Sequence, residues 1–330
     1  MIDARTLLRS LDDAQPTSGS ALAARFGVSR AAVWKQIEAL RASGAPIEAA
    51  AGSGYRLRGP LALLDADAIR AAMPDPVRRK LRSLDVHWQI DSTNSALNRR
   101  VQAGDPGPGA CFAEIQTAGR GRRGRGWQLP LGGGLACSVW RRFDAGMASM
   151  AGLSLAVGIG VVRALERMGY NGIGLKWPND LYHEGLKLGG ILVELGGEAL
   201  GPCHAIIGVG LNVHIDAAAG TTIDQPWTDL ASVRAGLPID RNRIAACLLE
   251  HLLDVLECFA QSSFAAFVDE YARHDVLCGK CVRIIGGRGE RFGEAAGVDR
   301  QGALMLRTAD GELLVDSGEV SVRPQSGTAP

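Results

Sequence analysis

An arginine- and glycine-rich segment, residues 119–127, carries the side chains best suited to chemistry in this sequence. It holds four arginines and no acidic residue. A guanidinium group binds phosphate through paired hydrogen bonds, and glycine allows a loop to open and close over a substrate. Strand-like segments flank this stretch closely, at 111–115 and 135–140. The pattern therefore predicts an ordered loop that closes over a polyanionic ligand.

Two other interpretations of residues 119–127 have to be weighed. Gly119, Gly121 and Gly124 satisfy the G-x-G-x-x-G pattern of dinucleotide-binding folds. In those folds the glycines open a helix, whereas here Gly126 is followed by Trp-Gln-Leu-Pro, which is a poor helix start. A disordered Arg/Gly tract could also bind RNA, but this stretch is short and lies between strands. Both interpretations are therefore weaker than the closing loop.

A cluster of small polar residues, Asp91-Ser-Thr-Asn94, follows the apolar run 86–90. Its hydroxyl and amide groups suit the neutral polar head of a ligand that both donates and accepts hydrogen bonds. The same residue types also cap helices well, so a purely structural role is the alternative.

Two lysine motifs come later in the chain. Lys176-Trp-Pro-Asn-Asp180 is typical of a strand that runs into a proline-forced turn, and Lys187-Leu-Gly-Gly-Ile-Leu-Val-Glu194 begins with a lysine that precedes two glycines and a strand. A single lysine is usually a solvated surface charge. Neither motif indicates a function by itself.

The N-terminal segment has the pattern of two short helices joined by a glycine turn. Ser18 can cap a helix that runs to about Phe26. Ser29 can cap a second helix that ends near Gly44. Apolar residues recur on the second helix at helical spacing and are expected to face inward: Val33, Ile37 and Leu40. This pattern predicts a helix-turn-helix, whose second helix enters the major groove of DNA by its N-terminal end.

Charge supports DNA binding by this segment. The whole chain has a net charge of only +1, but residues 1–60 hold eight Lys or Arg and five Asp or Glu. A basic hairpin at 52–57 follows the second helix as a wing. The residues expected to contact DNA are Ser29, Arg30, Lys35, Gln36 and Arg56. The alternative is a helical hairpin used for contacts with protein.

The composition is that of an ordinary globular protein, with 46% hydrophobic and 22% charged residues. No apolar run reaches the roughly 18 residues that span a bilayer, and the start lacks the apolar stretch of a signal peptide. We therefore expect a cytoplasmic protein with no membrane partner. The seven cysteines are an odd number, which argues against a closed disulfide framework. Cys278-Gly-Lys-Cys281 lacks the two further ligands of a zinc site.

Composition along the chain predicts three domains. Residues 1–64 form the winged helix-turn-helix, and residues 65–275 mix strand-like runs with long helical stretches. Residues 276–330 contain short strands separated by glycine turns and no helical pattern, which indicates a small barrel.

Four motifs in this order resemble the biotin–protein ligase family: D-S-T-N, Q-x-A-G-R-G-R-x-G-R-x-W, K-W-P-N-D and K-x-x-G-I-L-x-E. The resemblance covers nearly the whole chain and is to the bifunctional type, a ligase that also represses the biotin operon. It implies an α+β fold. The expected parts are a winged helix-turn-helix, a central mixed sheet with helices like that of class II aminoacyl-tRNA synthetases, and a C-terminal SH3-like barrel.

The resemblance also implies an activity. The family joins biotin to ATP with Mg²⁺ to form biotinyl-5′-AMP and pyrophosphate. It then transfers biotin to one lysine of a biotin carboxyl carrier protein, such as that of acetyl-CoA carboxylase. A homodimer bound to operator DNA is the implied repressor. The alternatives are a ligase whose head binds no operator, and a non-catalytic transcription factor that senses biotin.

By the same resemblance, biotin and its adenylate contact Ser92, Thr93, Asn94, Gln116, Arg120, Gly121, Arg122, Trp127 and Lys187. Trp127 is expected to cover adenine. Lys187, Arg120 and Arg122 are the expected catalytic residues, because cations offset the repulsion between a carboxylate and a phosphate. Their joint presence favours the enzyme over the non-catalytic sensor. The metal ligands are not identified, and Asp180 is only a candidate.

Overall fold

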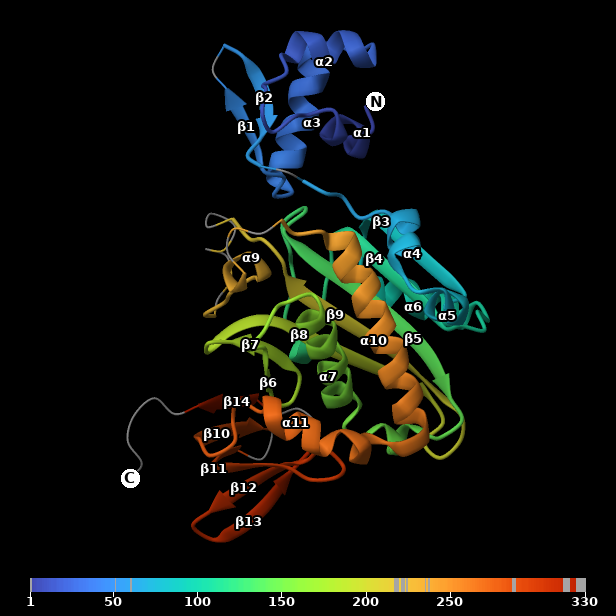
Figure 1. Ribbon diagram of the computed structural model, residues 1–330, viewed down its shortest axis with the longest axis vertical. Helices are drawn as coiled ribbons and strands as arrows, with labels where there is room; N and C mark the ends of the chain where they lie inside the picture. Colours follow the sequence, from blue (N-terminus) through green and yellow to red (C-terminus); the bar gives the residue numbers. More distant parts are fainter. Residues whose placement is uncertain are drawn as a thin grey trace.

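The computed structural model describes residues 2–324 except 51, 60, 217–219, 221, 222, 224, 235, 237, 287, 288 and 317–320. Three parts follow one another along the long axis of the molecule (Figure 1). A small helical head lies at one end, a large sheet with helices lies in the middle, and a group of short strands lies at the other end. This order agrees with the fold class predicted from the sequence.

The head contains three helices and a hairpin. These are α1 (Ala4–Arg9), α2 (Gly19–Phe26), α3 (Arg30–Ala42), β1 (Ile47–Ala50) and β2 (Gly54–Leu57). The Ser18 and Ser29 side chains accept hydrogen bonds from backbone N–H groups in the first turns of α2 and α3, as predicted. Gly27 ends α2 with a φ of 63°, a left-handed conformation that glycine adopts at little cost. Val33, Ile37 and Leu40 are buried in the core of the head.

The middle part is built on one seven-stranded mixed sheet. In spatial order its strands are β3 (Ser83–Ile90), β4 (Gly109–Gln116), β5 (Gly134–Phe143), β9 (Cys203–Asn212), β8 (Leu186–Gly197), β7 (Asp180–His183) and β6 (Gly174–Lys176). Strands β3 and β4 are parallel, and the remaining neighbours are antiparallel. The sheet brings the ends of distant motifs next to one another.

Helices cover both faces of this sheet. One face packs on α7 (Leu153–Arg167) and α10 (Arg241–Ser262), and the other packs on α6 (Thr93–Gln102). Alternate residues of β5 serve the two faces, because Val139 joins the large core under α7 and α10 while Trp140 joins the small core under α6. The shorter elements are α4 (Ala66–Ala72), α5 (Asp75–Lys80), η1 (Arg122–Gly124), η2 (Met147–Met150), α9 (Leu230–Val233), η3 (Phe264–Phe267) and α11 (Val268–His274).

The C-terminal part is a five-stranded antiparallel sheet. Its strands are β13 (Gly311–Val315), β12 (Leu304–Thr308), β11 (Gly289–Val298), β10 (Cys281–Gly286) and β14 (Ser321–Pro324), in spatial order. Its apolar side chains Val282, Leu304 and Leu306 belong to the same core cluster as the middle part. Trp177 Nε1 also donates to Gly302 O at 3.0 Å. The C-terminal strands are therefore packed firmly against the sheet domain.

The head also contacts the middle part. Leu131, from the segment that follows the arginine-rich loop, is buried in the core of the head. Its backbone N–H donates to Ser43 O, at the C-terminal end of α3, at 2.9 Å. Arg58, just after the hairpin, forms an ion pair with Asp216. Two segments that border β5 and β9 are therefore tied to the head.

A buried ion pair fixes the connection between the head and the sheet. Arg241 Nη2 donates to Glu114 Oε2 at 2.7 Å, and the two side chains are only 4% and 2% exposed. The other oxygen of Glu114 accepts from Leu64 N at 2.5 Å, and Arg241 also donates to Ala62 O. The connecting segment is therefore anchored through the charged pair.

Replacing Arg241 with methionine is expected to lower the free energy of unfolding by about 3–5 kcal/mol, because Glu114 would stay buried without its counter-charge. Urea denaturation measures the change. In the matched control, Arg307→Met removes an exposed pair with Glu294 (3.1 Å) and should cost less than about 1 kcal/mol. Equal losses in the two variants would show that burial does not set the strength of the first pair.

The structure describes the cysteines, the possible metal ligands and the helices. All seven cysteines are free. Within the described ranges, no three His, Cys, Asp or Glu side chains come together to hold a metal ion. Within the same ranges, no helix is long and apolar enough to cross a bilayer.

Candidate functional site

A cavity of about 470 Å³ lies between strands β5, β8 and β9 and the arginine-rich loop, residues 119–127. All nine residues that we expected to contact a ligand line it. They are Ser92, Thr93, Asn94, Gln116, Arg120, Gly121, Arg122, Trp127 and Lys187. Motifs that are far apart in the sequence therefore share one cavity.

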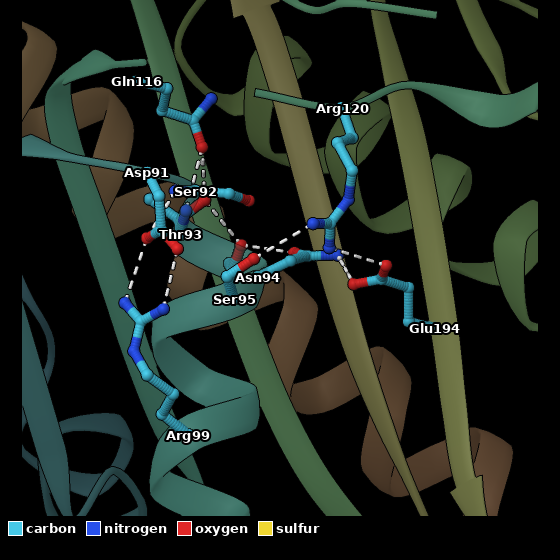
Figure 2. Close-up of polar contacts among 10 residues, drawn as sticks. Asp91, Ser92, Thr93, Asn94, Ser95, Arg99, Gln116, Arg120 and Glu194 are labelled. Carbon is cyan, nitrogen blue, oxygen red and sulfur yellow. Dashed lines mark hydrogen bonds and ion pairs between the residues drawn. The ribbon is translucent and has the colours of Figure 1, made fainter. Parts of the chain in front are cut away.

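The polar floor of the cavity is formed by the start of α6 and the end of β4 (Figure 2). Gln116 Oε1 accepts from the backbone N–H of Thr93 at 2.9 Å and from its hydroxyl at 3.1 Å. Ser138 donates to Asn94 Oδ1 at 2.6 Å. Ser92 occupies the cap position of α6, but its side chain makes no capping hydrogen bond. The hydroxyl and amide groups here are arranged for a neutral ligand more than for helix capping.

Asp91, the first residue of this motif, has a structural role. Arg99 donates to its two carboxylate oxygens at 2.7 and 3.0 Å, as Figure 2 shows. These hydrogen bonds are the main reason why the pKa of Asp91 is lowered to about 2. The Asp91 carbonyl also accepts from Ala118 N at 2.8 Å. Asp91 thus joins the start of α6 to the start of the arginine-rich loop.

The arginine-rich loop is ordered, as predicted. Gly121 N donates to Arg125 O at 2.7 Å, and Trp127 N donates to Gly119 O at 2.9 Å. Only the short turn η1 forms within it, and no helix follows, so the dinucleotide-binding interpretation does not apply. Arg122 Nη1 donates to Asn179 Oδ1 at 3.4 Å across the cavity, and burial lowers the pKa of Arg122.

Lys187 is a mostly buried cation in this site. Its side chain is 13% exposed and its Nζ lies 2.8 Å from Asp180 Oδ1. The same Nζ lies 5.6 Å from the centroid of the Trp127 ring. Lys187 is therefore not the solvated surface charge that a single lysine usually is.

Two glycines of β9 create the room for these side chains. A Cβ atom on Gly210 would lie 2.3 Å from Trp127 Nε1, and one on Gly208 would lie 2.6 Å from Asn94 Oδ1. Any larger residue would displace the floor of the cavity or the tryptophan. Trp127 Nε1 is buried, and no described group accepts its hydrogen bond. It is a donor available to a ligand.

Comparisons with known proteins agree with this geometry. Residues 86–212 match the model of the biotin/lipoate A/B protein ligase family, residues 4–56 match an HTH domain, and residues 277–323 match a biotin protein ligase C terminal domain. The chain is 39% identical to the bifunctional ligase/repressor BirA of Salmonella typhimurium, over 96% of this chain and 97% of that protein.

The chain belongs to the bifunctional biotin–protein ligase family. The family, fold class and enzyme type expected from the sequence are thereby confirmed. A second relative, the biotin–[acetyl-CoA-carboxylase] ligase of Mycobacterium tuberculosis, is 36% identical over 72% of this chain and 88% of that protein. The biotin protein ligase of Aquifex aeolicus, solved in complex with biotin and ATP, has a TM-score of 0.63 and 28% identity. The match covers 74% of this chain and 100% of the Aquifex aeolicus chain.

Four cationic residues that line the ligase site were not predicted as ligand contacts: Arg123, Arg125, Lys176 and Arg323. Lys176 is buried in the cavity, where its Nζ donates to Tyr182 Oη at 3.1 Å and burial lowers its pKa to about 8. Arg323 reaches the same cavity from β14. Lys176 stands in the K-W-P-N-D motif, which was the available signal. Arg323 has no local signal, because only the packing of the C-terminal strands brings it to the site.

In the head of this ligase, the residues expected to contact DNA do not all have the same surroundings. Arg30 and Lys35 are exposed near the start of α3, with Gln36 partly exposed beside them. Ser29 caps the helix. Arg56 pairs with Glu48 across the hairpin, so part of its charge is already neutralised. Trp34, which we did not assign, is 59% exposed on the same helix.

Proposed function

We propose that this chain activates biotin with ATP and transfers the biotinyl group to a lysine of a biotin carboxyl carrier protein. The observation that carries the proposal is a single cavity that combines a neutral hydrogen-bonding floor with several cations. The floor suits the ureido head of biotin, and the cations suit its carboxylate and the phosphates of ATP. The name of the mycobacterial relative supports acetyl-CoA carboxylase as the source of the carrier.

In the first step an oxygen of the biotin carboxylate attacks the α-phosphorus of ATP. The new bond joins that oxygen to phosphorus, and the bond from the α-phosphorus to the bridging oxygen breaks, so that pyrophosphate leaves with the electron pair. Two anions must approach each other, and buried cations reduce this repulsion far more than exposed ones. We assign this role mainly to Lys187, with a smaller contribution from Arg122 and with Lys176 and Arg323 beside the departing phosphates.

In the second step the neutral amine of the carrier lysine attacks the acyl carbon of biotinyl-5′-AMP. A carbon–nitrogen bond forms, the bond from the acyl carbon to the phosphate oxygen breaks, and AMP leaves with that electron pair. The amine nitrogen loses one proton to water. The adenylate is an anhydride that water would also attack. The arginine-rich loop covers the cavity, and we infer that its closure keeps water and bystander amines away until the carrier docks.

Mg²⁺ fits this site as a companion of ATP. Among the described residues that line the cavity, Asp180 is the one carboxylate, and Asn179 adds an amide oxygen. Mg²⁺ typically binds one or two carboxylates together with substrate phosphates and water. Asp180 would hold the ion, which would neutralise phosphate charge during the reaction.

The direct test is to incubate the full chain with ATP, Mg²⁺, biotin and an apo carrier domain, and then to blot with streptavidin. We expect a biotinylated carrier only when all four components are present. A carrier that stays unlabelled while the chain still binds biotin would favour the non-catalytic sensor.

The pH dependence should reveal Lys176. Because burial lowers its pKa to about 8, the free enzyme loses this cation as the pH rises above that value. We expect kcat/KM for ATP to fall about tenfold per pH unit above pH 8, since this parameter reports on free enzyme. Lys176→Arg keeps its proton and should flatten the profile. ATP–pyrophosphate exchange measures this pH profile. If kcat/KM of Lys176→Arg still falls above pH 8, Lys176 is not the group whose loss of a proton lowers the activity.

We also propose that the head binds operator DNA as part of a homodimer in the cytoplasm, where ATP is available. Residues 192–197 of β8 pair with β9 on one edge, and none of the strands in the described ranges pairs with their other edge. Such an edge can pair with a second copy. The test is sedimentation and gel shift with biotin and ATP. If biotin and ATP change neither dimerisation nor the affinity for DNA, the repressor function is excluded and the ligase function still stands.

A further inference from the structure

Glu194, the last residue of the K-x-x-G-I-L-x-E motif, has no role in the reaction described above. It lies on β8, and its carboxylate joins two different parts of the site, as Figure 2 shows. Asn94 Nδ2 donates to Glu194 Oε2 at 2.8 Å, and Arg120 Nη2 donates to Glu194 Oε1 at 2.9 Å. Among the described residues that line the cavity, Asn94 and Arg120 are present and Glu194 is not. Glu194 therefore acts through its two partners.

The first partner receives a fixed orientation. An ionised carboxylate only accepts hydrogen bonds, so Asn94 must turn its Nδ2 toward Glu194 and its Oδ1 toward Ser138. Ser138 then gives its single hydroxyl proton to Asn94 Oδ1, 2.6 Å away. Ser138 Oγ also lies 2.7 Å from Thr93 Oγ1. The charge of Glu194 thus sets which groups of the floor donate and which accept.

The second partner belongs to the loop that covers the cavity. Besides its bond to Glu194, Arg120 donates through Nη1 to Ser95 Oγ at 3.1 Å. Its guanidinium therefore spans from α6 to β8. Arg120 and Glu194 are 45% and 37% exposed, so water competes for both and the ion pair contributes little to folding stability. A weak, solvent-accessible contact of this kind suits a loop that must open again.

We propose that Glu194 is a positioning residue that orients the Asn94 amide for biotin and holds the loop closed through Arg120. The proposal rests on the ligase function stated above. In this proposal the Glu194 carboxylate supports both biotin recognition and loop closure, so both functions weaken together when Glu194 loses its charge. The groups that surround the phosphates, Lys176, Lys187 and Arg323, lie outside this network.

The test is Glu194→Gln in the full chain. Glutamine has the same shape, but its side-chain amide replaces one carboxylate oxygen with an NH2 group. That NH2 group would face an N–H donor of either Asn94 or Arg120. In ATP–pyrophosphate exchange we expect the KM for biotin to rise about 10- to 100-fold, as for a lost hydrogen bond to a charged group. The KM for ATP should stay within about twofold, because the phosphate contacts are untouched. The matched control is Glu198→Gln, in the exposed turn after β8.

The loop function of Glu194 is tested by a second set of variants. Escape of the adenylate is measured as biotinylation of a bystander protein in the absence of carrier. Glu194→Gln and Arg120→Gln should each increase it, and the double variant should leak no more than the worse single one, because the two changes remove one shared contact. The effect on the KM for biotin should persist in the Arg120→Gln background, because it passes through Asn94.

Three results would overturn the proposal. An unchanged KM for biotin in an active Glu194→Gln enzyme would exclude the orientation of Asn94. Equal rises in KM for biotin and ATP, with a lowered melting temperature, would show a general structural role. Additive leakage in the double variant would exclude the shared contact. If the wild-type chain shows no biotin-dependent exchange, the ligase function fails and the role of Glu194 fails with it.

Discussion

Replacing Lys187 with alanine is expected to slow the formation of biotinyl-5′-AMP about 100- to 1000-fold, as when one preorganised donor is removed from a charged transition state. Lys187 is nearly buried, and its Nζ is 2.8 Å from Asp180. The variant would therefore lose a cation beside the reacting groups, and Asp180 would lose the ammonium group that pairs with it.

Single-turnover quenched flow with labelled ATP measures this step directly. The KM for biotin should change less than the rate, because the polar floor is intact. Lys280→Ala, at an exposed turn before β10, is the matched control and should react at the wild-type rate. If Lys187→Ala forms biotinyl-5′-AMP as fast as wild type does, Lys187 has no role in the first step.

Replacing Arg122 with glycine should mainly release the intermediate and slow its formation much less. Arg122 stands in η1 of the covering loop and bonds across the cavity to Asn179 at 3.4 Å. Glycine removes this contact and makes the loop backbone more flexible, so the closed loop is less populated. We expect bystander lysines to be biotinylated at least about tenfold faster, as for a loss of about 1.4 kcal/mol of loop closure.

Streptavidin blotting of a bystander protein, without a carrier, measures the escape. Arg122→Lys keeps the charge but not the planar fork of the guanidinium, and its leakage should lie between those of wild type and Arg122→Gly. The assignment fails if Arg122→Gly and Lys187→Ala slow single-turnover adenylation equally and Arg122→Gly does not leak. The two variants thus distinguish the formation of the adenylate from its retention in the cavity.

The local structure of this protein could be predicted where neighbouring residues decide it. Ser29 caps α3 because its hydroxyl is adjacent to the N–H groups of the same turn. The short strands expected within residues 276–330 appear as β10, β11 and β12, because short strands and glycine turns depend on consecutive residues. The arginine-rich loop was likewise predicted as ordered from the strands that flank it.

The surroundings of the predicted site residues could not be obtained in the same way. Lys187 could be chosen from its motif, but its burial and its contact with Asp180 depend on how β7 pairs with β8. Arg56 was expected to contact DNA from its basic surroundings in the sequence, and the register of the hairpin also places Glu48 directly opposite it. A sequence motif gives the identity of a side chain and leaves its partners open.

The sequence alone therefore determined the helix-turn-helix of the head, the short C-terminal strands, the family, and the residue types of the site. The tertiary structure decided which of them meet: Arg323 enters the cavity from the last strand, Leu131 enters the core of the head, and Glu194 joins Asn94 to Arg120. The physical reason is that caps and turns depend on forces between adjacent residues. Contacts between distant residues form only when whole elements pack, and many positions share that packing.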